Sequence, residues 1–193
     1  MSHFYAILSR MKYIKRWGLM RNTRDENLSE HSLEVAYIAH ALALIANKRF
    51  GKNIDAAAAA VAAMYHDTSE ILTGDMPTPI KYYNPEIKGA YKKIEAVAER
   101  ELIDMLPEDL REDFADIYEP DEDIARLVKA ADKLSALIKC IEESNMGNRE
   151  FKSAEEAARK ALNEMNLPEA NVFMEEFLAS FSMTLDEQRQ IKK

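Results

Sequence analysis

Apolar residues recur every three to four positions along most of the chain, with charged residues between them. The clearest example is the series Ile124, Leu127, Val128, Ala131, Leu134, Ile138 and Ile141. This spacing is typical of helices that bury one face. No stretch alternates apolar and polar residues as a half-buried strand does. We therefore predict an all-α fold. The second helix should begin near Asn27 or Ser29 and end near Gly51, and the others lie at about residues 4–15, 56–72, 85–106, 108–117, 121–143, 153–165 and 169–181.

Capping residues and prolines indicate where these helices begin and end. The helix over 56–72 is apolar on nearly every side, which predicts that it is the buried central helix. Pro77 and Pro79 predict that residues 74–84 form a stiff loop in which no helix continues. The predicted N-terminal caps are Asn27 with Glu30, Asp55, Asn84 with Pro85, and Ser153 with Glu156.

Length and composition narrow the possible classes of protein. A chain of 193 residues is expected to form one domain, 1–193, with the helices from about residue 153 as an extension. Cys140 is the only cysteine, which excludes an intrachain disulfide and favours a cytoplasmic location. Neither a signal peptide nor a membrane-spanning run is expected. The net charge of -8 argues against binding to a nucleic-acid polymer.

Two histidines and two aspartates are predicted to point into the helical core. His31 begins the apolar stripe of its helix, His66 and Asp67 interrupt an otherwise apolar helix, and Asp132 lies beside Ala131. Buried carboxylates without a partner are costly, so these side chains need a common one. A divalent cation would provide it. Imidazole together with carboxylate suits Co, Mn, Zn or a similar ion better than Ca.

Each of these residues also has an ordinary structural interpretation. A single inward histidine is more often a core residue than a ligand. Asp132 could pair with Lys133 or Lys129, and Asp67 could pair with Arg24. The adjacent histidine and aspartate on an apolar helix favour the metal site, because nothing else explains two polar residues there.

Several segments of the sequence carry a resemblance to a known family. The pattern His31, His66-Asp67 and Asp132 resembles the metal site of the HD-domain phosphohydrolase superfamily. Within it, the chain looks like the bacterial 5′-deoxynucleotidases of the YfbR type. The matching segments are Arg16-Trp17, Met20-Arg21-Asn22, Glu26-Asn27, Ser29 to Leu33, Met64 to Glu70, Leu72 to Pro79, Lys81-Tyr82, and Asp132 with Lys139-Cys140.

The resemblance implies a compact HD-domain helical bundle with the metal site between its central helices. It also implies hydrolysis of deoxyribonucleoside 5′-monophosphates to the deoxynucleoside and phosphate, in preference to ribonucleotides. A small nucleotide would be the substrate, and a homodimer is expected. The predicted metal ligands are His31, His66, Asp67 and Asp132. Three of them (His31, Asp67 and Asp132) are also expected to contact the substrate.

Other residues receive predicted roles around that metal. Arg16 would orient the phosphate through its planar donors, with Lys81 adding charge. Glu70 shares a helix face with His66 and Asp67, which fits a catalytic acid and a surface acid near a helix end equally well. The resemblance implies that Glu70 transfers a proton, with Asp75 as the alternative acid. Trp17 would crowd the sugar 2′ position, although a core role for it is a strong competitor. The resemblance adds substrate contacts by Asp75, Met76, Pro77 and Thr78.

Two rival functions remain open from the sequence. The chain could be another HD phosphohydrolase, acting on deoxynucleoside triphosphates or as a nucleotide phosphodiesterase, although a triphosphate should need more cations than Arg16, Arg21, Arg24 and Lys81. It could instead be a nucleotide-binding sensor without turnover, which would need neither Glu70 nor Arg16.

Overall fold

The structure is a computed structural model that describes residues 1–81 and 83–189, so Tyr82 and residues 190–193 lie outside the described part. The prediction of an all-α fold is confirmed, since the described residues form helices and a single isolated β-bridge between Lys15 and Asn27. The α-helices are α1 (Phe4–Leu8), α2 (Leu28–Phe50), α3 (Ala56–Tyr65), α4 (Glu70–Thr73), α5 (Thr78–Lys81), α6 (Pro85–Asp104), α7 (Arg111–Tyr118), α8 (Glu122–Asn145), α9 (Lys152–Met165), α10 (Pro168–Phe177) and α11 (Leu185–Gln188). Short 3₁₀ helices are η1 (Ser9–Tyr13), η2 (Glu108–Leu110), η3 (Arg149–Phe151) and η4 (Leu178–Ser182).

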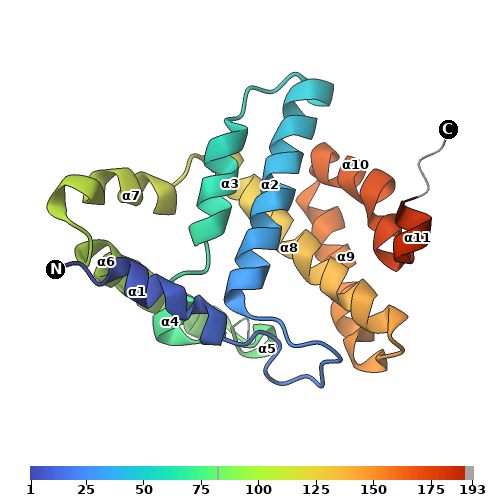
Figure 1. Cartoon of the computed structure of the whole chain (residues 1–193), viewed down its shortest axis with the longest axis horizontal. Helices are drawn as coiled ribbons and strands as arrows, with labels where there is room; N and C mark the ends of the chain where they lie inside the picture. Colours follow the sequence, from blue (N-terminus) through green and yellow to red (C-terminus); the bar gives the residue numbers. More distant parts are fainter. Residues whose placement is uncertain (82, 190–193) are drawn as a thin grey trace.

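Helices α2, α3 and α8 form the centre of the molecule (Figure 1). α2 packs against both α3 and α8, while α9 and α10 cover α8 and α2 from the other side. The main hydrophobic core lies between these five helices and includes Leu42, Leu134 and Leu137, all fully buried. The long helices thus present their apolar faces to one another, as the spacing of apolar residues predicts.

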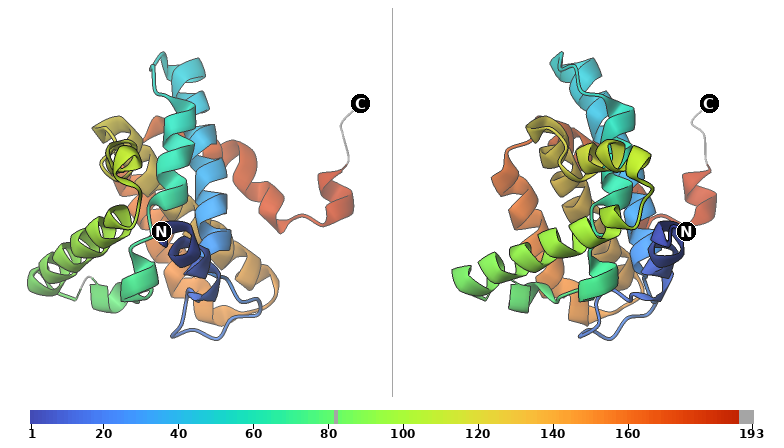
Figure 2. Two further views of the ribbon diagram at one scale, coloured as in Figure 1. Left: turned by 60° about the vertical axis from the view of Figure 1, so that its left-hand side comes forward. Right: turned by 90° about the vertical axis from the view of Figure 1, so that its left-hand side faces the viewer.

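A second, smaller core joins the N-terminus to the middle of the chain. Phe4, Leu102 and Leu106 pack together there, with Tyr65 and Phe114 beside them. This core holds α6 and α7 against α3, and in Figure 2 α6 extends away from the central helices. Among the described residues, no helix is both long and apolar enough to cross a membrane.

Three of the predicted N-terminal caps are confirmed. Asn27 forms a capping box with Glu30 at the start of α2, and its side chain accepts hydrogen bonds from Ser29 N and Glu30 N. The Asp55 side chain caps α3 by accepting from Ala57 N and Ala58 N, and the Asn84 side chain caps α6 by accepting from Ile87 N. These side chains satisfy backbone N–H groups that have no partner within the helix.

The helix predicted over residues 56–72 is interrupted, which corrects both its length and its burial. α3 ends at Tyr65, and the chain turns through residues 66–69 before α4 begins at Glu70. The Thr68 hydroxyl donates to Tyr65 O, while His66 Nδ1 lies 2.7 Å from Ala63 O. Such side-chain bonds to the backbone compete with the regular helix. Only Ala59, Ala62 and Ala63 of α3 are buried, so α3 is one of the three central helices but is not enclosed on nearly every side as predicted.

Several other boundaries also differ from the sequence prediction. The first predicted helix, 4–15, is a short α-helix followed by a 3₁₀ helix that ends at residue 13. The last predicted helix, 169–181, likewise ends as a 3₁₀ helix from residue 178. The loop over 74–84 contains α5, because its prolines occupy positions before and at the start of a helical turn, where a missing N–H costs little. Ser153 does not cap α9, since η3 runs directly into that helix.

Candidate active site

The structure brings the four predicted metal ligands together from three parts of the chain. His31 lies in the first turn of α2, His66 and Asp67 lie in the turn after α3, and Asp132 lies on α8. His31 Nε2 is 3.4 Å from Asp132 Oδ1 and 3.5 Å from Asp67 Oδ2. His66 Nε2 is 3.1 Å from the same Asp67 oxygen. The side chains of His31, His66 and Asp67 therefore meet between the central helices, and Asp132 lies beside them at His31.

The donor atoms of this cluster fit a divalent cation. The Nε2 atoms of His31 and His66 are both buried and have no hydrogen-bond partner. Ligand atoms of His31, His66 and Asp67 all lie within 4.8 Å of one another. Two buried ring nitrogens without partners beside two carboxylates leave a set of lone pairs that one cation would satisfy.

A hydrogen-bonded chain behind His31 holds its ring in place. His31 Nδ1 lies 3.1 Å from Ser135 Oγ, which in turn donates to Glu34 Oε2 at 2.6 Å. The sequence analysis did not identify Ser135 or Glu34. Their positions give a signal that could have found them: each lies three residues after a predicted ligand, His31 or Asp132, and thus on the same helix face.

The two aspartates each contact a nearby cation. Lys133 Nζ is 2.9 Å from Asp132 Oδ2, so one of the alternatives left open by the sequence is observed. Asp67 contacts Arg16 at 3.5 Å. Arg24, the other partner considered for Asp67, instead offers its carbonyl oxygen to Lys139 Nζ. Neither of these ion pairs provides a hydrogen-bond partner for the Nε2 atoms of His31 and His66.

Arg16 is buried beside the cluster and is held from two sides. Its Nε donates to Glu26 Oε1 at 2.9 Å, while its other end faces Asp67. Burial opposes the charge, but the carboxylates of Glu26 and Asp67 raise the pKa of the Arg16 guanidinium. Arg16 is therefore a fixed positive group at the edge of this cluster, where it could bind an anion.

Trp17 follows Arg16 and is half-buried. Its Nε1 donates to Glu26 Oε2 at 3.0 Å, and its ring centroid lies 5.2 Å from that of Phe151. Each interpretation of Trp17 given above is therefore supported by one contact. The ring packs on the buried Phe151, and the indole N–H shares Glu26 with Arg16.

Glu70 and Asp75 lie near the cluster on its other side. Glu70 has a buried side chain whose Oε2 has no hydrogen-bond partner, and Lys81 Nζ lies 3.8 Å from its Oε1. Burial and the charges of Asp67 and Asp75 raise the pKa of the Glu70 carboxyl to about 8. Burial also raises the pKa of Asp75, which accepts a hydrogen bond from the Trp17 backbone. Both carboxyls near Asp67 therefore hold a proton more readily than an exposed carboxyl does, and Glu70 does so near neutral pH.

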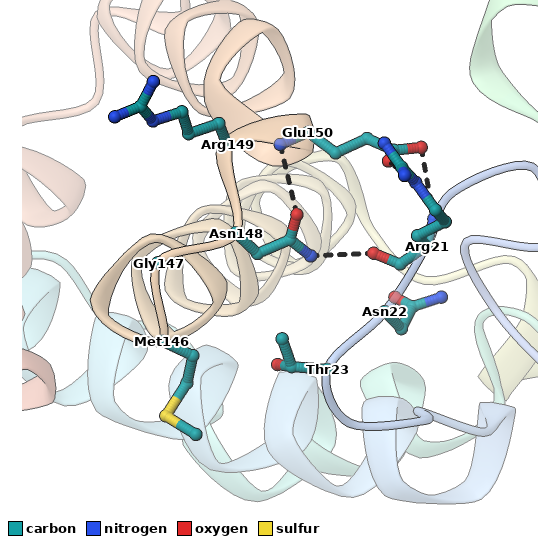
Figure 3. A pocket seen from close by; sticks show the side chains of 8 residues that line it. All are labelled: Arg21, Asn22, Thr23, Met146, Gly147, Asn148, Arg149 and Glu150. Atoms are coloured by element: carbon teal, nitrogen blue, oxygen red, sulfur yellow. Dashed lines mark hydrogen bonds and ion pairs between the residues drawn. The ribbon is translucent and has the colours of Figure 1, made fainter.

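The remaining predicted substrate contacts lie just after Asp75. Met76 and Pro77 are half-buried, and Thr78 is exposed at the start of α5. A separate hollow of about 720 Å³ lies where residues 21–23 meet residues 146–150. Figure 3 shows that Arg21, Asn148 and Glu150 bond to one another across it, and none of the four predicted metal ligands lines it.

Comparisons with known proteins agree with this geometry. The model of the family described as "5′-deoxynucleotidase YfbR-like" matches residues 3–181. The chain belongs to this family. Among its YfbR-like relatives, a 5′-deoxynucleotidase of Vibrio vulnificus is 54% identical over 189 residues, which is 96% of this chain and 97% of the relative. A 5′-deoxynucleotidase of Yersinia pestis is also 54% identical, over 97% of this chain and 96% of that protein.

Solved structures share the fold of this YfbR-like chain at lower identity. An HD-domain phosphohydrolase of Listeria innocua has a TM-score of 0.81 at 22% identity, over 93% of this chain and 88% of that one. The HD phosphohydrolase DatZ of cyanophage S-2L, described as bound to dA and one catalytic Zn²⁺ ion, has a TM-score of 0.66 at 20% identity, over 93% of this chain and 96% of that one. Both confirm that the bundle is an HD-domain fold.

Proposed function

We propose that the protein is a metal-dependent 5′-deoxynucleotidase. It would hydrolyse deoxyribonucleoside 5′-monophosphates to the deoxynucleoside and phosphate, in preference to ribonucleotides. The observation that carries this proposal is the meeting of His31, His66, Asp67 and Asp132, with both Nε2 atoms unpartnered, in a member of the YfbR-like family. The relatives that match nearly the whole chain are named 5′-deoxynucleotidases.

The four clustered side chains would hold one divalent ion. Cobalt, manganese and zinc all suit a set of two imidazoles and two carboxylates. When bound, such an ion supplies positive charge that acidifies water and neutralises phosphate charge. The carboxylates of Asp67 and Asp132 balance that charge, and Ser135 keeps the His31 ring in the required orientation.

Arg16 would bind the phosphate. Its guanidinium is already held by Glu26, so little side-chain freedom is lost when substrate binds. The same group would stabilise negative charge as it develops on the phosphate oxygens in the transition state. Lys81, held by Glu95 at 2.8 Å, would instead act on Glu70 by favouring its charged form.

Glu70 would move the proton. A carboxyl with a pKa of about 8 is protonated in part at neutral pH, so it can give a proton to the leaving 5′-oxygen or take one from water. Asp75 is the alternative acid and is bonded to the Trp17 backbone. Both groups were candidates from the sequence. Glu70 is favoured as the proton-transfer group because its Oε2 is buried and has no hydrogen-bond partner.

Trp17 would select the sugar. It would crowd the 2′ position, and Pro77 and Thr78 would form the opposite wall. Asp75 and Met76 would add further contacts to the substrate. An apolar wall rejects an added hydroxyl only about 100-fold. The preference for deoxyribonucleotides should therefore be strong but incomplete.

Other properties of the protein are proposed on narrower grounds. We propose one domain over residues 1–193, because α9 and α10 pack on α8 and α2. We propose a homodimer, since Leu33, Tyr37 and Leu44 are exposed apolar residues at helical spacing on α2. A cytoplasmic location is proposed from the single cysteine, Cys140, which is buried and free. Light scattering after gel filtration would test the dimer.

Phosphate release from purified protein tests the main proposal. The metal-stripped protein would be assayed with Co, Mn, Zn, Mg or no metal, on all four 5′-dNMPs, the matching NMPs and 3′-dAMP. We expect metal-dependent phosphate release from the 5′-dNMPs, with the other substrates slow. Release of pyrophosphate or triphosphate from dNTPs would instead support the rival HD phosphohydrolase. Binding without any turnover would support the sensor.

A further inference from the structure

Residues 16–26 form a loop between η1 and α2, and the two ends of this loop lie side by side. Arg16 N donates to Glu26 O at 3.0 Å, and Leu28 N donates to Ile14 O at 2.9 Å, so the two ends of the loop are paired. The proposed phosphate-binding Arg16 and sugar-selecting Trp17 stand at the beginning of this loop. Glu26 stands at its end, ten residues later in the chain but directly opposite Arg16.

Glu26 uses each of its two carboxylate oxygens for one of these residues. Oε1 accepts from Arg16 Nε at 2.9 Å, and Oε2 accepts from Trp17 Nε1 at 3.0 Å. The Oε1 atom also lies 3.5 Å from His31 Nδ1. Only 13% of the Glu26 side chain is exposed. One buried carboxylate thus touches the phosphate-binding, sugar-selecting and metal-binding parts of the proposed site.

We propose that Glu26 is a positioning residue that fixes Arg16 and Trp17 relative to each other, and that it thereby sets both phosphate binding and the preference for deoxyribose. This inference rests on the function proposed above for Arg16 and Trp17. Glu26 does not touch the reacting atoms in this scheme. Its role is to place a cation and an aromatic wall at a fixed separation before the substrate arrives.

The chemistry of the contact requires a carboxylate. Arg16 Nε and Trp17 Nε1 are both donors and cannot bond to each other. An ionised carboxylate accepts on both oxygens, whereas the amide of glutamine accepts on one side and donates on the other. A glutamine of the same shape can therefore keep Arg16 or Trp17 but not both.

Trp17 has an unfavourable backbone conformation, so contacts such as the bond from its Nε1 to Glu26 are needed to hold it in place. Trp17 has φ 59°, in the left-handed region that residues other than glycine rarely adopt. Contacts elsewhere hold the distal part of the loop: Asn148 Nδ2 donates to Arg21 O, and Glu150 pairs with Arg21 Nε at 2.6 Å (Figure 3). Because that part is anchored separately, loss of Glu26 should loosen Arg16 and Trp17 without releasing the whole loop.

Trp17 is the only tryptophan in the chain, so its fluorescence reports on this contact directly. The variants are Glu26→Gln and Glu26→Ala. The matched control is Asp25→Asn, which removes the neighbouring carboxylate that pairs with exposed Lys15. Emission wavelength and acrylamide quenching would be measured without substrate, and the metal content of each protein would be determined with them.

We expect Glu26→Ala, which removes both contacts, to shift the Trp17 emission to longer wavelength and to increase quenching, with the metal content unchanged. With 5′-dNMPs, kcat/KM should fall roughly 10- to 100-fold, as for loss of a hydrogen bond to a charged group. The ratio of deoxy- to ribonucleotide activity should fall with it. Asp25→Asn should match the wild type in every measurement.

A double variant separates positioning from general damage. If Glu26 acts on sugar selection through Trp17, then Glu26→Gln should not lower the deoxy-to-ribo ratio further in a Trp17→Ala background. Wild-type emission in both Glu26 variants would overturn the proposal. So would a loss of bound metal with an unchanged deoxy-to-ribo ratio, because Glu26 would then act through His31. A wild type that hydrolyses no deoxynucleotide would refute the proposed function instead, while the fluorescence, which needs no substrate, would still decide whether Glu26 holds Trp17.

Discussion

Glu70 gives a test of the site that needs neither substrate nor metal. Its side chain is 5% exposed, and burial together with Asp67 and Asp75 raises its pKa to about 8, from an ordinary 4.5. Between these two pH values the folded protein binds a proton on Glu70 that the unfolded chain has lost. Stability must therefore fall as the pH rises through this window.

The size of this effect follows from the width of the window. Each pH unit is worth about 1.4 kcal/mol for one proton. Across the range from 4.5 to 8, Glu70 should thus cost the folded state about 5 kcal/mol. Replacement of Glu70 by glutamine removes the titration and keeps the shape. The free energy of unfolding of Glu70→Gln relative to the wild type should therefore increase by several kcal/mol between pH 5 and pH 8.5.

Urea unfolding followed by circular dichroism would measure this difference, with a chelator present to keep both proteins free of metal. The comparison between variants matters, because His66 also has a raised pKa and changes the stability of both proteins alike. Glu101→Gln, at an exposed position on α6, is the matched control and should give a difference that does not vary with pH. A stability difference for Glu70→Gln that is equally constant would refute the reasoning.

Four further changes test other parts of the structure. Ser135→Ala removes the partner of His31 Nδ1 and should weaken metal binding about 10- to 100-fold, as measured by competition with a chelator. Trp17→Ala should bring the deoxy-to-ribo activity ratio close to one, and an unchanged ratio would contradict the crowding of the 2′ position. Asn27→Ala should lower the free energy of unfolding by about 0.5–2 kcal/mol through loss of the α2 cap. Leu134→Ala, in the fully buried core, should lower it by about 2–5 kcal/mol in the same urea assay.

The sequence predicts the long helices and their caps well, because these depend on local patterns. Asn27 with Glu30 needs only its own backbone to form a capping box, and the same holds for Asp55. The meeting of His31, His66, Asp67 and Asp132 was predicted from their inward positions together with the family resemblance. That these four residues bind a metal ion stays a prediction, which the phosphate-release and chelator-competition assays test.

Features that depend on contacts between distant residues could not be predicted in this way. The break after Tyr65 arises because Thr68 bonds to the backbone and to Tyr118, fifty residues away. Likewise, Glu26 carries no local signal that its two oxygens would meet Arg16 and Trp17. Single-sequence patterns show which face of a helix is buried, but not which side chains meet across a loop.

Helix α8 connects the predicted metal site to the loop over residues 16–26, because it holds a residue that contacts each of them. Asp132 reaches the metal cluster from it, while Glu143, about 16 Å further along the helix axis, accepts bonds from Thr23 and the Arg24 backbone. A tilt of α8 would therefore change the position of Asp132 relative to the other predicted metal ligands, and that of Glu143 relative to the loop it anchors. Catalytic rate should respond to such a tilt well before the fold is lost, which makes activity a finer gauge of core packing than the melting temperature.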